Sequence, residues 1–173
     1  MSSKIRNITY IGLMAAVISV ISVWQIPVPL LGVGMTLQTF AVCLAGYTLK
    51  KWRGTVSVLL YIVIGAVGIP VFSGFQGGFS VLLGPSGGFI FGFIPLCILC
   101  SLPSSSKPLP SFLFGIIGLV ICHGAGVLQY CIVAKVSLGL SFLVVSLPYI
   151  LKDIISVFLA KLLASQLIKR IGK

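Results

Sequence analysis

One carboxylate stands out in this sequence of 173 residues. Asp153, within PYILKDIISVF (148–158), is the only acidic residue, against twelve Lys and Arg. An ionised carboxylate inside an apolar helix is costly, so such residues are usually paired, directed at a cavity, or functional. Two interpretations are open. Asp153 is a structural acid, paired with a base or protonated and bonded to a backbone carbonyl, or it is a ligand anchor that accepts N–H bonds.

The neighbours of Asp153 in the sequence indicate which side chains share its helix face. Tyr149 lies four residues earlier and Ser156 three residues later, so both fall on the face of Asp153. Lys152 is adjacent in sequence and is expected to point elsewhere. We therefore expect no ion pair between Lys152 and Asp153 within the helix.

A glycine-rich stretch, GFQGGFSVLLGPSGGF (74–89), is the second candidate site. Its glycines permit positive φ and close approach of the backbone, and Pro85 fixes a turn before the next apolar run. Ser86 could cap the helix that follows and leave backbone N–H groups for an anionic group. The alternative is an ordinary re-entrant loop that needs small residues. The stretch lacks the lysine and the strand of a Walker or dinucleotide motif.

The stretch VGMTLQTF (33–40) places neutral donors and acceptors where an apolar run begins. Thr36, Gln38 and Thr39 can cap a helix or line a binding site. The sequence alone does not choose between these two roles.

Two pairs of small residues occur in IGLMAAVIS (11–19), Gly12 with Ala16 and Ala15 with Ser19. This spacing lets a second helix pack closely. Because such pairs are common, packing within the chain is the favoured interpretation, and docking of a partner is the alternative.

Cysteine and histidine are the remaining residues with metal-binding or redox chemistry. Cys97-x-x-Cys100 and Cys122-His123 are present, but no second CxxC and no HExxH appears. Cysteines in apolar runs are better explained as packing residues. His123 is the only histidine and has no acid near it in sequence, so no nucleophile–base pair is identified. We expect no catalysis, no bound metal and no cofactor.

The elements that position these residues are predicted to be membrane helices. The chain is 58% hydrophobic and 8% charged, with a mean hydropathy of +1.23, which is too apolar for a soluble domain. Long apolar runs favour helices over a barrel. The net charge of +11 comes from bases at the ends of these runs. That placement is typical of topology signals and contacts with anionic lipid, and it argues against nucleic-acid binding.

Six transmembrane spans fit the apolar runs and form one polytopic domain, residues 1–173. The spans are about 7–25, 34–50, 54–72, 87–102, 111–134 and 142–167. Lys135 alone lies on one side of the predicted membrane. On the other side lie Lys4, Arg6, Lys50, Lys51, Arg53, Lys107, Lys169, Arg170 and Lys173. This asymmetry predicts an all-α, multi-pass protein of the cell (inner) membrane with both termini cytoplasmic, whose first span is retained rather than cleaved.

The order of these features resembles the BioY family, the biotin-binding S components of energy-coupling factor (ECF) transporters. The resemblance is carried by VGMTLQTFAVCLAG, YIVIGAVGIPVFSGFQGGFSVLLGPSGGFIFGF and LPYILKDII, and it covers nearly the whole chain. It implies six helices with an outward-facing site closed by the first and third loops. It also implies a membrane coupling subunit and two ATP-hydrolysing subunits as partners, with Gly12 and Ala16 docking on the coupling subunit.

The resemblance further implies the site residues. The family aspartate falls on Asp153, whereas Lys152 and Ser156 stand where the family has glycine and lysine. Lys152 or another base would then replace the family lysine. Ser86 and Phe89 stand where the family has threonine and tyrosine.

Biotin suits these residues. Its ureido ring offers two N–H donors to a carboxylate, and its carboxylate could meet backbone N–H groups of the glycine-rich stretch. Its fused ring and chain suit an apolar pocket, expected to be lined by Phe75, Phe79, Phe89 and Tyr149. The expected substrate-binding residues are Asp153, Lys152, Ser156, Tyr149, Gln76, Gly77, Gly78, Ser86, Phe89, Thr36 and Gln38. The alternatives are an S component for another vitamin and a non-transporting membrane scaffold subunit.

Overall fold

The computed structural model describes residues 3–26, 34–49, 51–102 and 108–171. These residues are mostly helical, as the apolar runs predict. The first half contains α1 (Ser3–Val23), β1 (Gln25–Ile26), β2 (Met35–Thr36), α2 (Gln38–Leu49) and α3 (Lys51–Ala66). The second half contains α4 (Phe79–Leu83), α5 (Gly87–Ser101), α6 (Pro108–Ala134), α7 (Leu138–Val145) and α8 (Leu147–Ile171). Three bases of the predicted cytoplasmic set, Lys50, Lys107 and Lys173, lie outside the described residues.

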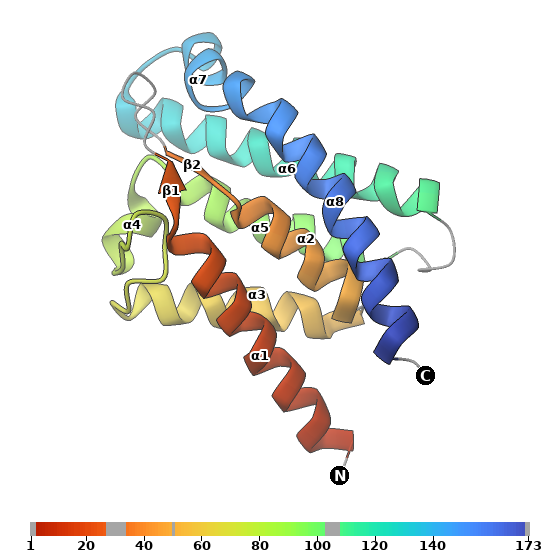
Figure 1. The fold of residues 1–173 in the computed structure, drawn as a ribbon. Coiled ribbons are helices and arrows are strands. Elements are labelled where there is room, and N and C mark those ends of the chain that lie inside the picture. The colour runs from red at the N-terminus through yellow and green to blue at the C-terminus, as the bar shows by residue number, and fades with distance from the viewer. Residues whose placement is uncertain (1–2, 27–33, 50, 103–107, 172–173) are drawn as a thin grey trace.

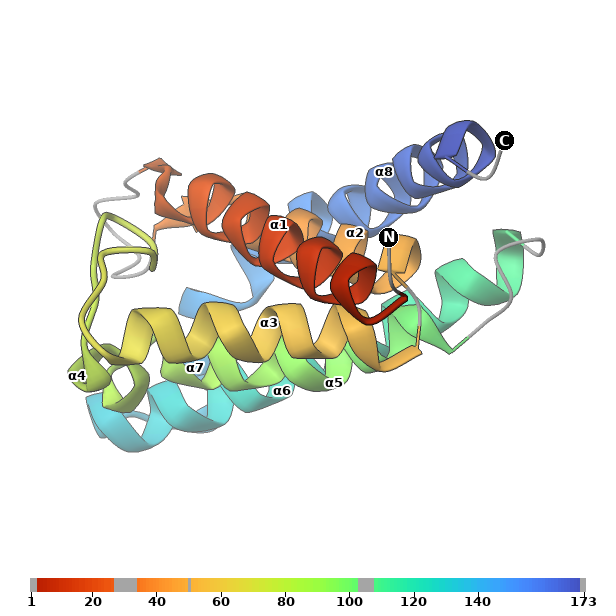
Figure 2. The same ribbon diagram turned by 90° about the horizontal axis from the view of Figure 1, so that it is seen from below.

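The long helices form two layers. Helices α1, α2 and α8 make one layer, and α3, α5 and α6 make the other, as Figures 1 and 2 show from two directions. Helix α5 packs along α6, while α2 packs against both α5 and α8. The short strands β1 and β2 and helix α4 lie together at one end of the layers (Figure 1). Parts of two candidate stretches, 33–40 with β2 and 74–89 with α4, therefore lie at this end.

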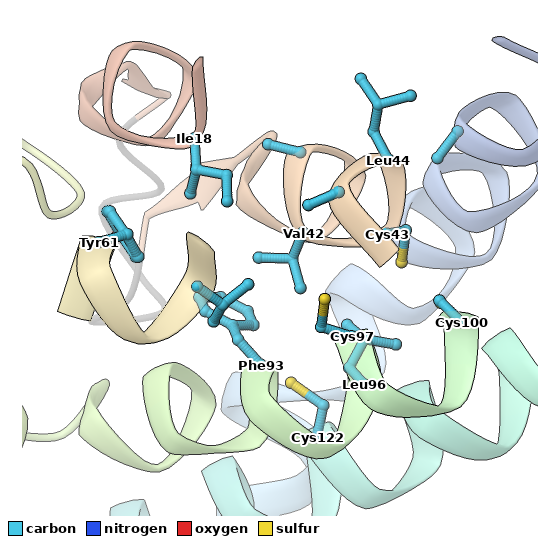
Figure 3. Packing of buried hydrophobic residues seen from close by; sticks show 14 of the residues in the cluster. Ile18, Val42, Cys43, Leu44, Tyr61, Phe93, Leu96, Cys97, Cys100 and Cys122 are labelled. Atoms are coloured by element: carbon cyan, nitrogen blue, oxygen red, sulfur yellow. The ribbon is translucent and has the colours of Figure 1, made fainter. Parts of the chain in front are cut away.

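Helix α2 forms the centre of the bundle and is buried on nearly every side. Val42 is directed toward Phe93 and Cys97 of α5, as Figure 3 shows. Four of the five cysteines, Cys43, Cys97, Cys100 and Cys122, are buried as free thiols in the hydrophobic core. They pack as small apolar side chains, and the described residues contain no group of three or more His, Cys, Asp or Glu placed to hold a metal ion.

The outer surface is rich in large apolar side chains, which suits contact with lipid. Among the described residues, Lys4–Val23 and Leu109–Ala134 are helices long and apolar enough to cross a membrane. Helices α7 and α8 together qualify as a third span, bent by 52° at a break between them. Trp52–Ala66 and Gly87–Ser101 are shorter apolar helices.

Two predicted spans are shorter as helices than the apolar runs suggest. The run 34–50 becomes helical only at Gln38, because residues 35–36 pair with β1 as a strand. The run 54–72 ends as helix at Ala66, where Gly68 adopts a φ of 108° and Pro70 follows. The apolar residues after Ala66 fold back as a loop over the end of the bundle. Hydropathy cannot separate such an apolar loop from a helix end.

The small residues of α1 divide between two faces. Ala15 is buried, and the Ser19 hydroxyl donates to the Ala15 carbonyl at 2.9 Å. A Cβ built on Gly12 would meet no atom within 4 Å, and Ala16 is exposed. The favoured interpretation, packing within the chain, therefore fails for the Gly12–Ala16 pair and leaves it available on the surface.

Candidate functional site

A cavity of about 230 Å³ lies between α2, α5, α8 and the loops at one end of the bundle. Its lining combines aromatic side chains with polar ones, which is typical of a site for a small organic ligand. The lining residues are Gln25, Gly34, Thr36, Gln38, Thr39, Phe72, Ser73, Gln76, Val81, Pro85, Ser86, Phe89, Ile90, Phe93, Val145, Tyr149, Lys152 and Asp153.

Asp153 is the buried polar centre of this cavity, with 4% of its surface exposed. Its Oδ2 lies 3.2 Å from Nε2 of His123. Its Oδ1 lies 2.5 Å from Nζ of Lys152 as an ion pair, yet it receives no aligned hydrogen bond from the described residues. A carboxylate oxygen can accept more than one hydrogen bond, so Oδ1 can still accept an N–H donor of a ligand beside its ion pair with Lys152.

The expectation that Lys152 points away from Asp153 is wrong. The two residues are neighbours on α8, but the long flexible stem of a lysine lets its ammonium curl around the helix toward the cavity. Lys152 Nζ also donates to the Thr36 carbonyl at 2.7 Å. One cation therefore balances the only acid of the chain and ties α8 to strand β2.

Thr36, Gln38 and Thr39 all line the cavity. Thr36 also has a local structural role, since its Oγ1 accepts from the Gln38 backbone N–H at 3.4 Å. The Gln38 amide donates to the Tyr61 hydroxyl at 2.9 Å. The polar start of α2 is thereby fixed in place before any ligand arrives.

Residues of two loops line the cavity, and these loops are joined to each other. Strands β1 and β2 pair Gln25 with Thr36. Gln25 Oε1 then accepts from the Ser73 hydroxyl at 2.5 Å, and the Gly74 N–H donates to the Val23 carbonyl at 3.1 Å. The first loop is thus bonded to the loop that follows α3. Gln25 and Ser73 of these segments line the same cavity as Asp153.

The glycine-rich stretch is only partly in the site. Gln76 and Ser86 line the cavity, whereas Gly77 and Gly78 do not. The Gly78 N–H donates to the Gly65 carbonyl at 2.7 Å, and a Cβ on Gly77 would lie 2.6 Å from the Ile69 carbonyl oxygen. These glycines therefore permit close packing on the end of α3, and the Gly78 amide is not free for an anionic group.

Ser86 occupies the N-cap position of α5, but its side chain makes no capping hydrogen bond, contrary to expectation. It lines the cavity instead. The turn before it is fixed by Gln129 of α6, whose amide donates to the carbonyls of Leu82 and Gly84 at 2.8 Å each. The sequence gives no indication of this role of Gln129, because its partners are 45 or more residues away.

The aromatic lining differs from expectation. Phe89 and Tyr149 line the cavity, but Phe75 and Phe79 are about 60% exposed and lie outside the lining. Phe75 packs edge-on against Trp24 on the surface, with ring centroids 6.0 Å apart. Phe72 and Phe93 line the cavity instead, and neither was predicted to do so. Ser156 is buried but also lies outside the lining, one turn farther along α8.

His123, which the sequence analysis set aside, contacts the carboxylate of Asp153. It lies 30 residues from Asp153 in sequence, and the packing of α6 against α8 brings the two side chains together. Its Nδ1 lies 2.8 Å from the Ser146 hydroxyl, at the break between α7 and α8. A single buried histidine in a chain with a single acid was the one available signal.

Comparison with known proteins shows which proteins this chain resembles. The model of the BioY family matches residues 1–173. The biotin transporter BioY of Thermotoga maritima is 36% identical over 171 residues, covering 95% of this chain and 96% of that protein. The biotin transporter BioY2 of Lactococcus lactis subsp. cremoris is 33% identical over 174 residues, covering 99% of this chain and 94% of that protein.

A solved structure has the same fold. The crystal structure of the S-component for biotin from an ECF-type ABC transporter superposes with a TM-score of 0.88 at 25% identity. The alignment covers 98% of this chain and 95% of the other.

Proposed function

The chain belongs to the BioY family, and we propose that it captures biotin in the cavity beside Asp153 as the S component of an ECF-type transporter. It is an integral membrane protein that binds its substrate and catalyses no reaction. The observation that carries the site is Asp153 Oδ1, a buried acceptor in the cavity with no hydrogen bond from the described residues. A ligand with N–H donors would satisfy it.

The cavity suits the two chemically distinct parts of biotin. The ureido N–H groups would meet the Asp153 carboxylate, and the fused ring would lie against Phe89 and Tyr149. Because the Gly78 amide is bonded within the protein, the biotin carboxylate would turn instead to side-chain donors at the loop end. Ser86 and Gln76 are the lining residues placed for that role.

The membrane arrangement follows from the same proposal. Six spans with both termini in the cytoplasm would turn the loop-covered end of the cavity to the outside of the cell membrane. A coupling subunit and two ATPase subunits would supply the energy for import. The basic cytoplasmic ends would contact anionic lipid rather than nucleic acid.

A panel of vitamins tests the ligand class directly. We expect biotin to raise the Tm of the detergent-solubilised protein, since a ligand at 100 times its Kd stabilises the folded state by about 2.7 kcal/mol. The measurement is a thermal-shift assay with biotin and other water-soluble vitamins at equal concentration. Stabilisation by a different vitamin would instead support an S component for that vitamin, and no stabilisation by any would favour the scaffold role.

The exposed Gly12–Ala16 surface of α1 supports docking of the coupling subunit there. We expect Gly12→Leu to lower biotin uptake at least tenfold when the coupling proteins are coexpressed, because a large side chain keeps two helices apart. Biotin binding by the isolated subunit should be unchanged. Gly139→Leu is the matched control, since Gly139 on α7 also has open space around it. Equal uptake by the two variants would place the docking surface elsewhere.

A further inference from the structure

His123 is the side chain of α6 that reaches the anchor carboxylate. It is buried, with 7% of its surface exposed, and its two ring nitrogens meet two different elements. Nε2 lies 3.2 Å from Asp153 Oδ2 on α8, and Nδ1 lies 2.8 Å from Ser146 Oγ at the break between α7 and α8. The Phe89 ring stands edge-on to the imidazole, with centroids 5.6 Å apart. The ring is therefore fixed on three sides.

We propose that His123 is a positioning residue for the ligand anchor: as a neutral ring protonated on Nε2, it holds Asp153 Oδ2 and leaves Oδ1 for the ligand. This inference rests on the proposed function. It adds a residue from α6 to the site, and it assigns Ser146 the role of hydrogen-bond donor to Nδ1 of that residue.

The tautomer follows from the partners. An ionised carboxylate only accepts, so the proton that joins His123 to Asp153 must be on Nε2. In the neutral ring Nδ1 then has only a lone pair, which accepts the Ser146 O–H. Lys152 already balances the charge of Asp153. A second buried cation on His123 would be uncompensated among these three groups, so the ring is neutral.

The way Asp153 is held determines which edge of a ligand it can bind. With Oδ2 held by His123 and Oδ1 in an ion pair with Lys152, the carboxylate has a fixed position in the cavity and can accept further hydrogen bonds there. A ligand edge that carries N–H donors is accepted there. An edge that carries carbonyl or carboxylate oxygens would place acceptor against acceptor and be refused. His123 thus makes the anchor selective for the donor edge of a ureido group.

One spectroscopic experiment reads the tautomer without any ligand. The chain has a single histidine, so ¹⁵N-labelled histidine reports His123 alone when the protein carries a histidine-free tag. We expect the two-bond ¹H–¹⁵N spectrum at neutral pH to show a neutral ring protonated on Nε2. In Asp153→Leu, which removes the acceptor of Nε2–H, the second tautomer should appear, while Ser146→Thr should keep the first. An Nδ1-protonated ring or an imidazolium in the wild-type protein would overturn the inference.

Biotin-binding measurements provide a second test of the role of His123. Biotin titration should give a Kd raised roughly tenfold or more in His123→Leu, because a hydrogen bond to a buried charge is lost. His123→Gln should keep the Kd within about threefold of the wild type, since its amide N–H can replace Nε2–H. Equal losses in both variants, or no loss in either, would contradict a positioning role.

The two proposals fail in distinguishable ways. If the wild-type protein binds no biotin, the proposed function fails, while the tautomer in the unliganded protein still tests the His123 arrangement. If it binds biotin but His123 carries its proton on Nδ1, only the inference about His123 fails.

Discussion

Asp153→Asn is expected to weaken biotin binding by about 2–4 kcal/mol, roughly 30- to 1,000-fold in Kd. Asparagine has nearly the same shape, but one of its two positions is an N–H donor rather than an acceptor. A ureido N–H would then face either a weaker neutral acceptor or another donor. Isothermal titration of purified protein with biotin measures the change.

Ser156→Ala is the control for this prediction. Ser156 is buried on the same helix but lies outside the cavity lining, so its loss should leave the Kd within about twofold. If Asp153→Asn bound biotin as well as the wild type, the anchor role would be wrong. If Ser156→Ala bound as weakly as Asp153→Asn, the site would extend along α8 beyond the cavity.

Lys152→Met is expected to lower both stability and biotin affinity. It leaves the Asp153 charge without its cation and removes the bond to the Thr36 carbonyl. Breaking a buried pair by removing one partner costs about 3–5 kcal/mol. The cost here should fall below that range, because 21% of the Lys152 side chain is exposed. A Tm several degrees lower, measured in detergent, is the expected result.

The double variant Lys152→Met, Asp153→Asn separates charge compensation from ligand binding. Removing both charges leaves no uncompensated ion, so the Tm should return close to the wild-type value. Biotin binding should stay weak, because the anchor is missing. If the double variant were less stable than Lys152→Met, the pair would not act by compensating charge.

The importance of Asp153 was predictable from the sequence as a hypothesis, but its structural partners were not. Asp153 is conspicuous because the chain holds no other acid, and the cost of a charge in a membrane predicts a special role. The cation was misjudged because helix geometry gives the direction of Cβ and not the reach of a four-carbon side chain. His123 was missed because proximity in sequence says nothing about two helices that pack 30 residues apart.

The loops were harder to predict than the helices. Hydropathy located the helical runs, yet it placed residues 67–72 in a helix that ends at Ala66. These residues form a loop in which residues 67–70 are exposed and only Val71 and Phe72 are buried. The positive φ of Gly68 and the Pro70 that follows end the helix there. Phe75 and Phe79 are aromatic, as residues of ligand pockets often are, but both side chains are exposed. Gly77 and Gly78 serve packing against α3, a role that glycine content alone does not distinguish from ligand binding.

The most direct test of the central claim is a structure of the protein with biotin bound. We expect biotin in the cavity between α2, α5 and α8, with its ureido nitrogens about 2.7–3.2 Å from the Asp153 carboxylate. Biotin in another part of the protein, or in this cavity with its ureido ring turned away from Asp153, would contradict the account.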